Sequence, residues 1–477
     1  MKVLIMGLGL HGGGLESARY LLKRGADLTV TDLRDEKTLA PSIGQLDAAC
    51  KGETPSRIRY VLGRHETGDF AKADMVVKNP GVRPDSPFLQ AARRVETDIS
   101  LFLTAVGSGE FPSVRIIAVT GSKGKSSAAS ALHWVLSHSL KNGKAYLGGN
   151  ITVSPLAFVD DMREDDHVVL ELSSWQLGDL RGRLRADGRP LLKPKSAVLT
   201  AIMPDHLDRY DSMEAYVADK RVIYQGQDSG DCTVAGDDEW GRGFLAESKA
   251  CPLLYANAPL PEGVSGGWVE DPAGPGYARL YGPNADGRRF ELVPAELLVP
   301  GRHQKINLLA ASLALPGLGL PPEIIRDSLG TFPGVEHRLE RFHQSGGISF
   351  YNDSAATVPE AAAAAVEALG GDGRLIIVTG GADKNLDFSP LVKAAAQVKA
   401  IVLLAGSGSD KLCSLFTIAG ICYYGPFDQL DKAAAAALGA AVSGDCVVLS
   451  PGCASFGMFL NEFDRGRKWK EELMKIT

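Results

Sequence analysis

A short stretch near residue 120 combines residue types that are suited to holding phosphate groups. The order is Thr120-Gly-Ser-Lys-Gly-Lys-Ser-Ser127, preceded by the apolar residues 116–119 and followed by an alanine-rich segment. This order predicts a strand, a turn and a helix, whose first backbone N–H groups and positive dipole attract an anion. Lys125 adds a charge for terminal phosphates, and Ser126 adds a hydroxyl for Mg²⁺. We therefore expect a protein that uses a nucleoside triphosphate.

The spacing of this turn departs from the common phosphate loop G-x-x-x-x-G-K-[ST]. Val119 stands where the first glycine of that pattern would be. A bare G-x-x-G-K-S string also arises by chance, so an ordinary turn without a ligand stays an alternative. The strand expected before the turn and the helix expected after it favour phosphate binding.

A second glycine-rich turn opens the chain. Gly7-x-Gly9-x-x-Gly12 follows an apolar strand, and Asp32 comes twenty residues after Gly12 at the end of another. This matches the dinucleotide fingerprint of NAD and FAD enzymes. The same backbone would hold any diphosphate, and Asp32 would accept from any ribose or uridine group, so a nucleotide-sugar diphosphate fits equally. A tight turn without a ligand is the third interpretation.

Further polar residues follow expected strands in the middle of the chain. Glu171 ends an apolar run, and a carboxylate buried there needs a cation, either Mg²⁺ beside the phosphate loop or a structural ion pair. His206 lies among Asp205, Asp208 and Arg209, which favours a polar site over a structural histidine. Lys220 follows on an expected helix over 213–224 and would by itself be read as a surface lysine.

The last third of the chain contains weaker candidates. Arg338 is suited to clamping a phosphate, and Asp353 to accepting a hydrogen bond from a ribose or an ammonium. Lys384 and Ser455 each lie just beyond an expected strand. Taken singly, a loop with glycine and serine is usually only a loop.

Composition narrows the class of protein. With 477 residues, 45% of them hydrophobic, the chain is long enough for two to four domains. A net charge of −6 argues against a general nucleic-acid binder. No apolar run approaches the ~20 residues that span a bilayer, and residues 1–6 are too short for a secretory signal. Seven scattered cysteines without a C-x-x-C pair favour reduced thiols. We expect a cytoplasmic protein.

The pattern of apolar strands and helices divides the chain into three α/β units. A linker is expected at 107–112, irregular edge strands at 231–300 and a helix near Gln304. Expected strands lie at 2–6, 28–32, 75–78, 167–172, 197–202, 348–351, 375–379, 401–404 and 447–450, and expected helices at 16–24, 360–369 and 431–441.

Taken together, these residues resemble the Mur ligases of peptidoglycan synthesis, and within them the branch that adds glutamate. Folylpolyglutamate synthase shares the fold and the ATP loop, but the N-terminal diphosphate loop fits the Mur branch better. The matching strings run from Gly7 to Gly466. They are Thr120–Ser126, Gly148–Asn150, Glu171–Ser174, Asp205–Tyr210, Gly301–His303 with Asn307, His337–Arg338, Asn352–Ser354, Gly380–Gly381 with Lys384, and Ser450–Ser455.

The resemblance implies three α/β domains. They are a Rossmann-like UDP-binding domain at 1–112, a central P-loop ATPase domain at 113–332 and a Rossmann-like domain for the amino acid and nucleotide at 333–477. It implies an ATP-dependent ligase that adds D-glutamate to UDP-N-acetylmuramoyl-L-alanine through an acyl phosphate, in cell-wall precursor synthesis. Ligation of L-glutamate or another amino acid is the alternative, and an NAD oxidoreductase that binds nucleotide sugars is an alternative of another class. A monomer without nucleic-acid or membrane partners is expected.

The resemblance also implies roles for individual residues. Catalytic roles fall to Lys125, His206, Lys220 and Arg338. Two Mg²⁺ sites would use Ser126, Glu171, His206 and Lys220, the lysine carrying a carbamate. ATP would contact Gly121, Ser122, Lys123, Gly124, Lys125, Ser126, Ser127, Asn307, Arg338 and Asp353. The UDP substrate would contact Gly9, Leu10, His11, Asp32, Asn79, Gly81, Asn150 and Ser173, and the amino acid Thr357, Lys384 and Ser455.

Five positions depart from the family pattern. Ala355 replaces a lysine that helps to bind the glutamate carboxylate, and Glu462 stands where an aromatic residue is usual. Gln304 replaces an asparagine, and Ser122-Lys123 replaces Thr-Asn in the phosphate loop. The first two changes concern the amino-acid site, so they leave the choice between D- and L-glutamate open.

Overall fold

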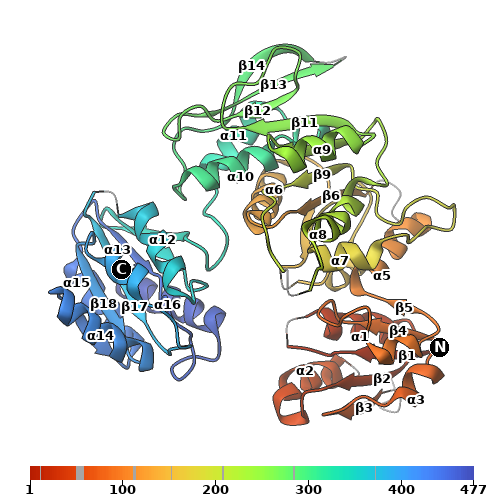
Figure 1. Cartoon of the computed structure of the whole chain (residues 1–477), viewed down its shortest axis with the longest axis horizontal. Helices are drawn as coiled ribbons and strands as arrows, with labels where there is room; N and C mark the ends of the chain where they lie inside the picture. Colours follow the sequence, from red (N-terminus) through yellow and green to blue (C-terminus); the bar gives the residue numbers. More distant parts are fainter. Residues whose placement is uncertain are drawn as a thin grey trace. The chain divides into compact units, whose positions relative to one another are not determined.

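Three separate β-sheets organise the protein. The computed structural model describes residues 1–477 except 11, 50–57, 111–113, 152, 207–208, 283–284 and 371. The chain divides into two compact units, 1–295 with 306–329, and 296–305 with 330–477. The first unit contains two sheets and the second contains one (Figure 1).

The N-terminal sheet has five parallel strands in the order β3-β2-β1-β4-β5. Because side chains alternate along a strand, Val3 and Ile5 of β1 pack under α1, α2 and α5, while Leu4 and Met6 pack under α3 and α4. The elements are β1 (Lys2–Met6), α1 (Gly13–Lys23), β2 (Asp27–Asp32), α2 (Glu36–Ala49), β3 (Ile58–Leu62), α3 (Thr67–Lys72), β4 (Met75–Lys78), α4 (Pro87–Gln90), β5 (Val95–Glu96) and α5 (Asp98–Ala105).

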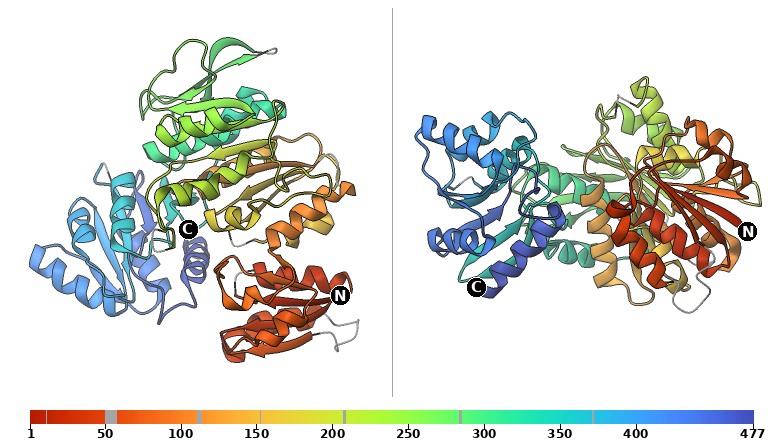
Figure 2. Two further views of the ribbon diagram at one scale, coloured as in Figure 1. Left: turned by 45° about the vertical axis from the view of Figure 1, so that its right-hand side comes forward. Right: turned by 90° about the horizontal axis from the view of Figure 1, so that it is seen from below.

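The central sheet has nine strands in the order β14-β13-β12-β11-β10-β9-β6-β8-β7. Strands β7 to β12 and β6 run parallel, and β13 and β14 form an antiparallel hairpin at one edge (Figures 1 and 2). The elements are β6 (Arg115–Thr120), α6 (Lys125–Ser139), β7 (Ala145–Gly149), β8 (His167–Glu171), α7 (Ser174–Leu180), β9 (Ser196–Leu199), α8 (Met213–Lys220), β10 (Cys232–Gly236), α9 (Glu239–Glu247), β11 (Cys251–Ala256), β12 (Gly266–Trp268), β13 (Gly276–Gly282), β14 (Ala285–Val293), α10 (Arg302–Ser312) and α11 (Pro322–Gly330).

Two expectations for the first unit are wrong in detail. The segment 231–300 is not a set of irregular edge strands, because β10 is a buried parallel strand between β9 and β11. Its apolar run is short, and the glycines and prolines that follow it hid the strand. The expected linker at 107–112 is helical up to Glu110, since a π-helical turn at Val106–Glu110 continues α5, and 111–113 lie outside the described residues.

The C-terminal sheet has six strands in the order β15-β16-β20-β17-β18-β19, with only β15 antiparallel. Ile377 and Ile401 face α12, α13 and α14, whereas Ile376 and Val402 face α15 and α16. The elements are β15 (Glu340–Ser345), β16 (Ile348–Asn352), α12 (Pro359–Leu369), β17 (Leu375–Gly380), α13 (Ser389–Ala395), β18 (Ala400–Leu404), α14 (Ser407–Ala419), β19 (Tyr424–Phe427), α15 (Leu430–Ala440), β20 (Cys446–Leu449) and α16 (Glu462–Ile476).

Each sheet falls inside one of the three domains expected from the sequence. The expected bounds 1–112, 113–332 and 333–477 stay predictions, and the first boundary falls among residues outside the described part. Among the described residues, no helix is both long and apolar enough to cross a membrane.

Candidate active site

The predicted phosphate loop joins β6 to α6. Gly124 precedes the helix in a left-handed conformation with φ 88°, and Gly121 has φ 147°, which other residues rarely adopt. A Cβ on Gly124 would lie 2.2 Å from Asn307 Oδ1, and one on Gly121 would lie 2.0 Å from Thr200 Oγ1. Both positions therefore require glycine, and Asn307 from α10 lies against the loop. Ser126 and Ser127 lie in the first turn of the helix.

Two lysine side chains meet at this loop. Lys125 Nζ donates to the carbonyls of Gly121 and Ser122, each at 3.0 Å, and Lys220 Nζ donates to the Gly121 carbonyl at 2.9 Å. Lys220 is 1% exposed, so the surface-lysine interpretation is wrong. Burial, and then the neighbouring charge of Lys125, lower the pKa of Lys220 to about 7. Near neutral pH a large share of this side chain is an uncharged amine.

Helix α8 holds Lys220 in place. The Ser212 hydroxyl caps its first turn, and the Tyr216 ring lies 4.4 Å from Lys220 Nζ. The Tyr216 hydroxyl lies 2.9 Å from Ser122 Oγ in the phosphate loop. The helix is thus tied to the loop at two points, which fixes the amine beside the phosphate-binding backbone.

Glu171 ends β8 and is 1% exposed. Its Oε1 accepts a hydrogen bond from Asn150 Nδ2 at 3.0 Å, and its backbone carbonyl accepts from Asn150 N at 2.8 Å. Strand β8 pairs directly with β6, so Val119 lies beside Glu171 in the register. The carboxylate therefore lies at the same end of the sheet as the phosphate loop.

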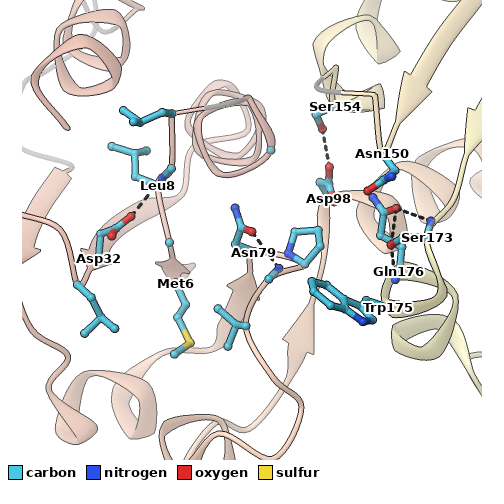
Figure 3. A pocket seen from close by; sticks show the side chains of 18 of the residues that line it. Met6, Leu8, Asp32, Asn79, Asp98, Asn150, Ser154, Ser173, Trp175 and Gln176 are labelled. Atoms are coloured by element: carbon cyan, nitrogen blue, oxygen red, sulfur yellow. Dashed lines mark hydrogen bonds between the residues drawn. The ribbon is translucent and has the colours of Figure 1, made fainter. Parts of the chain in front are cut away.

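A cavity of about 550 Å³ lies at the carboxyl ends of the N-terminal strands. One wall is the glycine-rich turn with Asp32 and Asn79, and the other comes from the central sheet with Asn150, Ser173 and Trp175 (Figure 3). All predicted UDP contacts in the described residues line it, namely Gly9, Leu10, Asp32, Asn79, Gly81, Asn150 and Ser173. His11 lies outside the described residues.

Asp32 shapes the turn as well as lining the cavity. Its Oδ2 accepts from Gly9 N at 3.2 Å, and its Oδ1 accepts from Arg34 N at 2.9 Å. The carboxylate thus spans from the glycine-rich turn to the residues that follow β2. A diphosphate on the turn would extend along this edge towards Asp32.

Two buried polar contacts join the N-terminal part of the first unit to its central part. Ser154 Oγ donates to Asp98 Oδ2 at 2.9 Å, and burial raises the pKa of Asp98. The Lys78–Asp179 pair, 2.6 Å apart, is 3% and 5% exposed. A buried pair is costly to break, so it fixes β4 of the first sheet against α7 of the second.

Trp175 separates the cavity from His206. The centroids of the Trp175 and His206 rings are 5.1 Å apart, and the guanidinium carbon of Arg209 lies 3.9 Å from the Trp175 ring centroid. His206 has a positive φ of 54° and lies 3.9 Å from Asp205 Oδ2. Its side chain is 45% exposed, so it is open to a ligand.

In the second unit, Asp353 follows β16 in a nearly enclosed position. Its Oδ2 accepts from Ser450 Oγ at 2.6 Å and its Oδ1 from Leu339 N at 3.1 Å. Burial raises the pKa of Asp353 to about 7. Arg338 is exposed between His337 and Leu339, whose φ values of 64° and 46° are strained for such residues. The turn thus presents the guanidinium next to Asp353.

The predicted amino-acid contacts also fall in the second unit. Thr357 is half-buried, Ser455 is buried, and the exposed Lys384 lies 5.7 Å from the Phe456 ring. Arg465, which is fully buried, donates to the Ser354 carbonyl at 2.8 Å and to the Cys453 carbonyl at 3.1 Å. It thereby joins the loop that contains Ala355 to the loop that contains Ser455.

Comparisons with known proteins match this arrangement along the whole chain. A family model described as the MurD-like N-terminal domain of Mur ligases matches residues 1–100. The Mur ligase middle domain matches 119–315, and the glutamate ligase domain of Mur ligases matches 337–453. The chain belongs to the Mur ligase family. The resemblance expected from the motifs is therefore confirmed, and so are the three α/β domains.

Three curated relatives of this Mur ligase have the same name. UDP-N-acetylmuramoylalanine–D-glutamate ligase of Treponema pallidum (strain Nichols) is 39% identical, over 99% of this chain and 97% of that protein. The protein of the same name from Roseiflexus sp. (strain RS-1) is 36% identical, over 100% and 99%. That from Borreliella afzelii (strain PKo) is 38% identical, over 99% and 97%.

Solved structures share the fold at low identity. The UDP-N-acetylmuramate-alanine ligase MurC of Thermotoga maritima has a TM-score of 0.58 and 18% identity, and both chains are covered completely. MurF of Acinetobacter baumannii has a TM-score of 0.56 and 14% identity, covering 99% of this chain and 93% of that one.

Several lining residues of this Mur ligase were not predicted from its sequence. Trp175 and Gln176 belong to the string Ser173-Ser-Trp-Gln176, where Ser173 and Gln176 form a capping box, so that pattern could have indicated them. Asp98, Ser154 and His65 follow no motif. Arg465 lies in the Glu462–Gly466 segment, where only burial reveals its importance.

One cluster in the second unit has the residue types of a metal site. Oxygen and nitrogen atoms of Glu336, His337 and Glu340 lie within 4.8 Å of one another. Lys470 Nζ lies 3.0 Å from Glu336 and 2.9 Å from Glu340. Because this ammonium already balances the two carboxylates, the cluster is an ion-pair network that anchors α16 next to Arg338.

Proposed function

We propose that this Mur ligase joins D-glutamate to UDP-N-acetylmuramoyl-L-alanine at the expense of ATP. The observation that best supports this proposal is a connected path of residues. Asn150 lines the cavity and bonds Glu171, and Glu171 lies on the strand next to the one that leads into the phosphate loop. A nucleotide-linked substrate in the cavity would bring a carboxylate at its far end to the terminal phosphate of ATP. Relatives of this name, 36% to 39% identical over nearly the full length of both chains, support the same reaction.

ATP and Mg²⁺ fit the residues present. The glycine cradle at Gly121 and Gly124, where a Cβ would collide, leaves backbone N–H groups for phosphate oxygens. The Ser126 hydroxyl and the Glu171 carboxylate are the oxygen ligands that Mg²⁺ prefers, and His206 would complete a second site. Bound Mg²⁺ would neutralise charge on the phosphate oxygens. Lys220, an amine with a pKa of about 7 beside Lys125, is suited to reaction with CO₂, giving a carbamate ligand.

The chemistry follows from the poor leaving group of a carboxylate. A carboxylate oxygen of the L-alanyl group attacks the γ-phosphorus of ATP, the bond to the bridging oxygen breaks, and ADP leaves. Lys125, and Arg338 from the last domain, would offset the charge that develops on the transferred group. The neutral amine of glutamate then attacks the acyl carbon, a proton leaves the nitrogen, and phosphate departs as the amide forms.

The second unit would supply the amino acid and part of the nucleotide site. Asn307, Arg338 and Asp353 are proposed to contact ATP, and Thr357, Lys384 and Ser455 to hold glutamate. Ala355 has no charge to bind the glutamate carboxylate, so Lys384 is the cation proposed to bind it. We also propose that the enzyme is cytoplasmic and monomeric, and that its domain boundaries lie between residues 112 and 113 and between residues 332 and 333.

The test is phosphate release from ATP with UDP-N-acetylmuramoyl-L-alanine and one amino acid at a time. D-glutamate, L-glutamate, meso-diaminopimelate and no amino acid would be compared, with Lys125→Ala as the inactive control. Release only with D-glutamate supports the proposal. Preference for L-glutamate would support the second candidate, and Ala355 and Glu462 would then be the positions to examine for its cause. No release with any of them contradicts the substrate assignment.

A further inference from the structure

His65 is a further residue that lines the cavity. It follows β3, and its ring lies edge-on to Phe88, with centroids 5.1 Å apart, and to Phe70, 6.0 Å apart. Its Nδ1 lies 2.8 Å from Thr31 Oγ1 at the end of β2. Three neighbours therefore fix the plane and direction of the imidazole ring.

The hydrogen bonds around Thr31 determine which ring nitrogen holds the proton. Thr31 Oγ1 also lies 3.0 Å from the Arg64 carbonyl oxygen, which can only accept. Since a hydroxyl has one proton, Thr31 must give it to Arg64 and accept from His65 Nδ1. Nδ1 is then the protonated nitrogen of a neutral ring, and Nε2 has a lone pair. No residue in the described part of the chain hydrogen-bonds Nε2.

The charge state of the ring agrees with this assignment. Burial lowers the pKa of His65, although the Asp32 carboxylate opposes the shift. The imidazole is therefore a neutral hydrogen-bond acceptor at neutral pH.

The proposed orientation of the substrate in the cavity indicates which part of it would lie next to His65 Nε2. The reacting carboxylate must lie at the Asn150 end, because Asn150 is bonded to Glu171. The diphosphate belongs on the Gly7–Gly12 turn in the middle. The nucleoside then lies at the opposite end, beside Asp32 and the segment that follows β3, where His65 is.

We propose that His65 is a uridine-binding residue that accepts, at Nε2, a hydrogen bond from the nucleoside of the substrate. The inference rests on the proposed function, which places a uridine diphosphate in the cavity. Uridine has two kinds of donor, the uracil N3–H and the ribose hydroxyls. The N3 of cytosine has no hydrogen, so two acceptors would face each other, and cytidine would be rejected if N3–H is the donor.

Equilibrium binding of UDP, CDP, N3-methyl-UDP and 2′-deoxy-UDP tests this with the full chain. His65→Phe keeps a ring against Phe70 and Phe88 but removes the acceptor. Loss of one hydrogen bond predicts that it binds UDP about tenfold more weakly than the unchanged protein. The variant should also lose one preference for UDP. If N3–H is the donor, it should no longer prefer UDP to N3-methyl-UDP and CDP. If a ribose hydroxyl is the donor, it should no longer prefer UDP to 2′-deoxy-UDP.

Controls separate the outcomes. Thr31→Val keeps the side-chain shape but removes the partner of Nδ1, and it should weaken UDP binding less than His65→Phe. Equal UDP binding by His65→Phe, or uniform weakening with all preferences kept, would overturn the inference. If the protein without substitutions binds no UDP and releases no phosphate from ATP, that result would instead contradict the proposed function. If His65→Phe folds poorly by circular dichroism, His65→Gln, which retains an acceptor, should bind UDP better than His65→Leu.

Discussion

Asn150 donates a hydrogen bond from Nδ2 to Glu171 Oε1 at 3.0 Å, joining the nucleotide cavity to the strand beside the phosphate loop. Asn150 lines the cavity and follows β7, whereas Glu171 ends β8. The two strands are adjacent and parallel, so both side chains emerge at the same end of the sheet. One amide thus lines the cavity proposed for the substrate and contacts the carboxylate proposed to hold Mg²⁺.

Glu171→Gln tests the proposed metal ligand. The amide is neutral, so the apparent affinity for Mg²⁺ should fall about 100-fold, while Asn150 can rotate to keep one hydrogen bond. Activity measured against Mg²⁺ concentration gives this shift. Glu164→Gln, an exposed change just before β8, should leave it unchanged. Equal Mg²⁺ dependence of both variants would exclude Glu171 as a ligand.

Lys220 should carry a carbamate at neutral and higher pH. Because its pKa is lowered to about 7, the reactive neutral amine dominates above that pH and disappears below it. A ¹³C NMR carbamate signal from labelled bicarbonate should therefore rise from pH 6 to pH 8. Lys220→Arg should abolish the signal and the activity, and Lys195→Arg should retain both. A signal that survives in Lys220→Arg would place the carbamate elsewhere.

The lowered pKa of Lys220 also has a consequence for stability. Between about pH 7 and the ordinary lysine value near 10.5, the unfolded chain holds a proton that the folded protein has lost. The free energy of unfolding contributed by this group therefore rises with pH over that window. Lys220→Met should remove this slope in urea unfolding. An unchanged slope would mean that the amine is charged in the folded protein.

Asp353→Asn should make the protein more stable while weakening ATP binding. The folded pKa of Asp353 is raised to about 7 from an ordinary value of 3.8, so the carboxylate destabilises the fold as pH rises through this window. The neutral amide lacks that penalty at pH 8. Urea unfolding at pH 5 and pH 8 measures it, with the exposed Asp372→Asn as control. Lower stability of Asp353→Asn at pH 8 would contradict the assignment.

Lys384→Ala tests whether the lysine at this position replaces the cation missing at Ala355. Loss of one charged hydrogen bond should raise the KM for D-glutamate about tenfold or more, with the KM for ATP unchanged. Lys393→Ala, an exposed change on α13, is the matched control. If both variants keep the KM of the unchanged protein, another group binds the glutamate carboxylate.

Arg465→Lys should destabilise the second unit. The guanidinium donates to two loops at once, and its burial lowers its pKa to about 10. A lysine keeps the charge but cannot reach both carbonyls, so the free energy of unfolding should fall by about 2 to 4 kcal/mol. Urea unfolding monitored at the buried Trp469 measures this. Arg467→Lys, which is exposed, should change it little.

Local pattern was sufficient to predict several strands and the glycine-rich turn of the phosphate loop. The strands at 2–6 and 75–78 agree with β1 and β4, and Gly124 occupies the conformation that only glycine adopts easily. Such features depend on a few neighbouring residues. The strand β10 was missed because its short apolar run looks the same in an edge segment and in a sheet interior.

Residues that act through long-range contacts could not be predicted. Asp98 meets Ser154 across 56 positions, and Arg465 meets Ser354 across 111. Nothing in the neighbouring sequence encodes those pairings, so only the fold reveals them. Lys220 is intermediate, since its motif context suggested a role but its burial, which lowers the pKa, became visible only in the structure.

The most direct test of the central claim follows oxygen from the substrate into phosphate. UDP-N-acetylmuramoyl-L-alanine labelled with ¹⁸O in its alanyl carboxylate would be incubated with ATP, Mg²⁺ and D-glutamate. The account predicts one ¹⁸O in each released phosphate, together with a product whose mass has increased by one glutamyl residue. Unlabelled phosphate, or phosphate release without that product, would contradict ligation through an acyl phosphate.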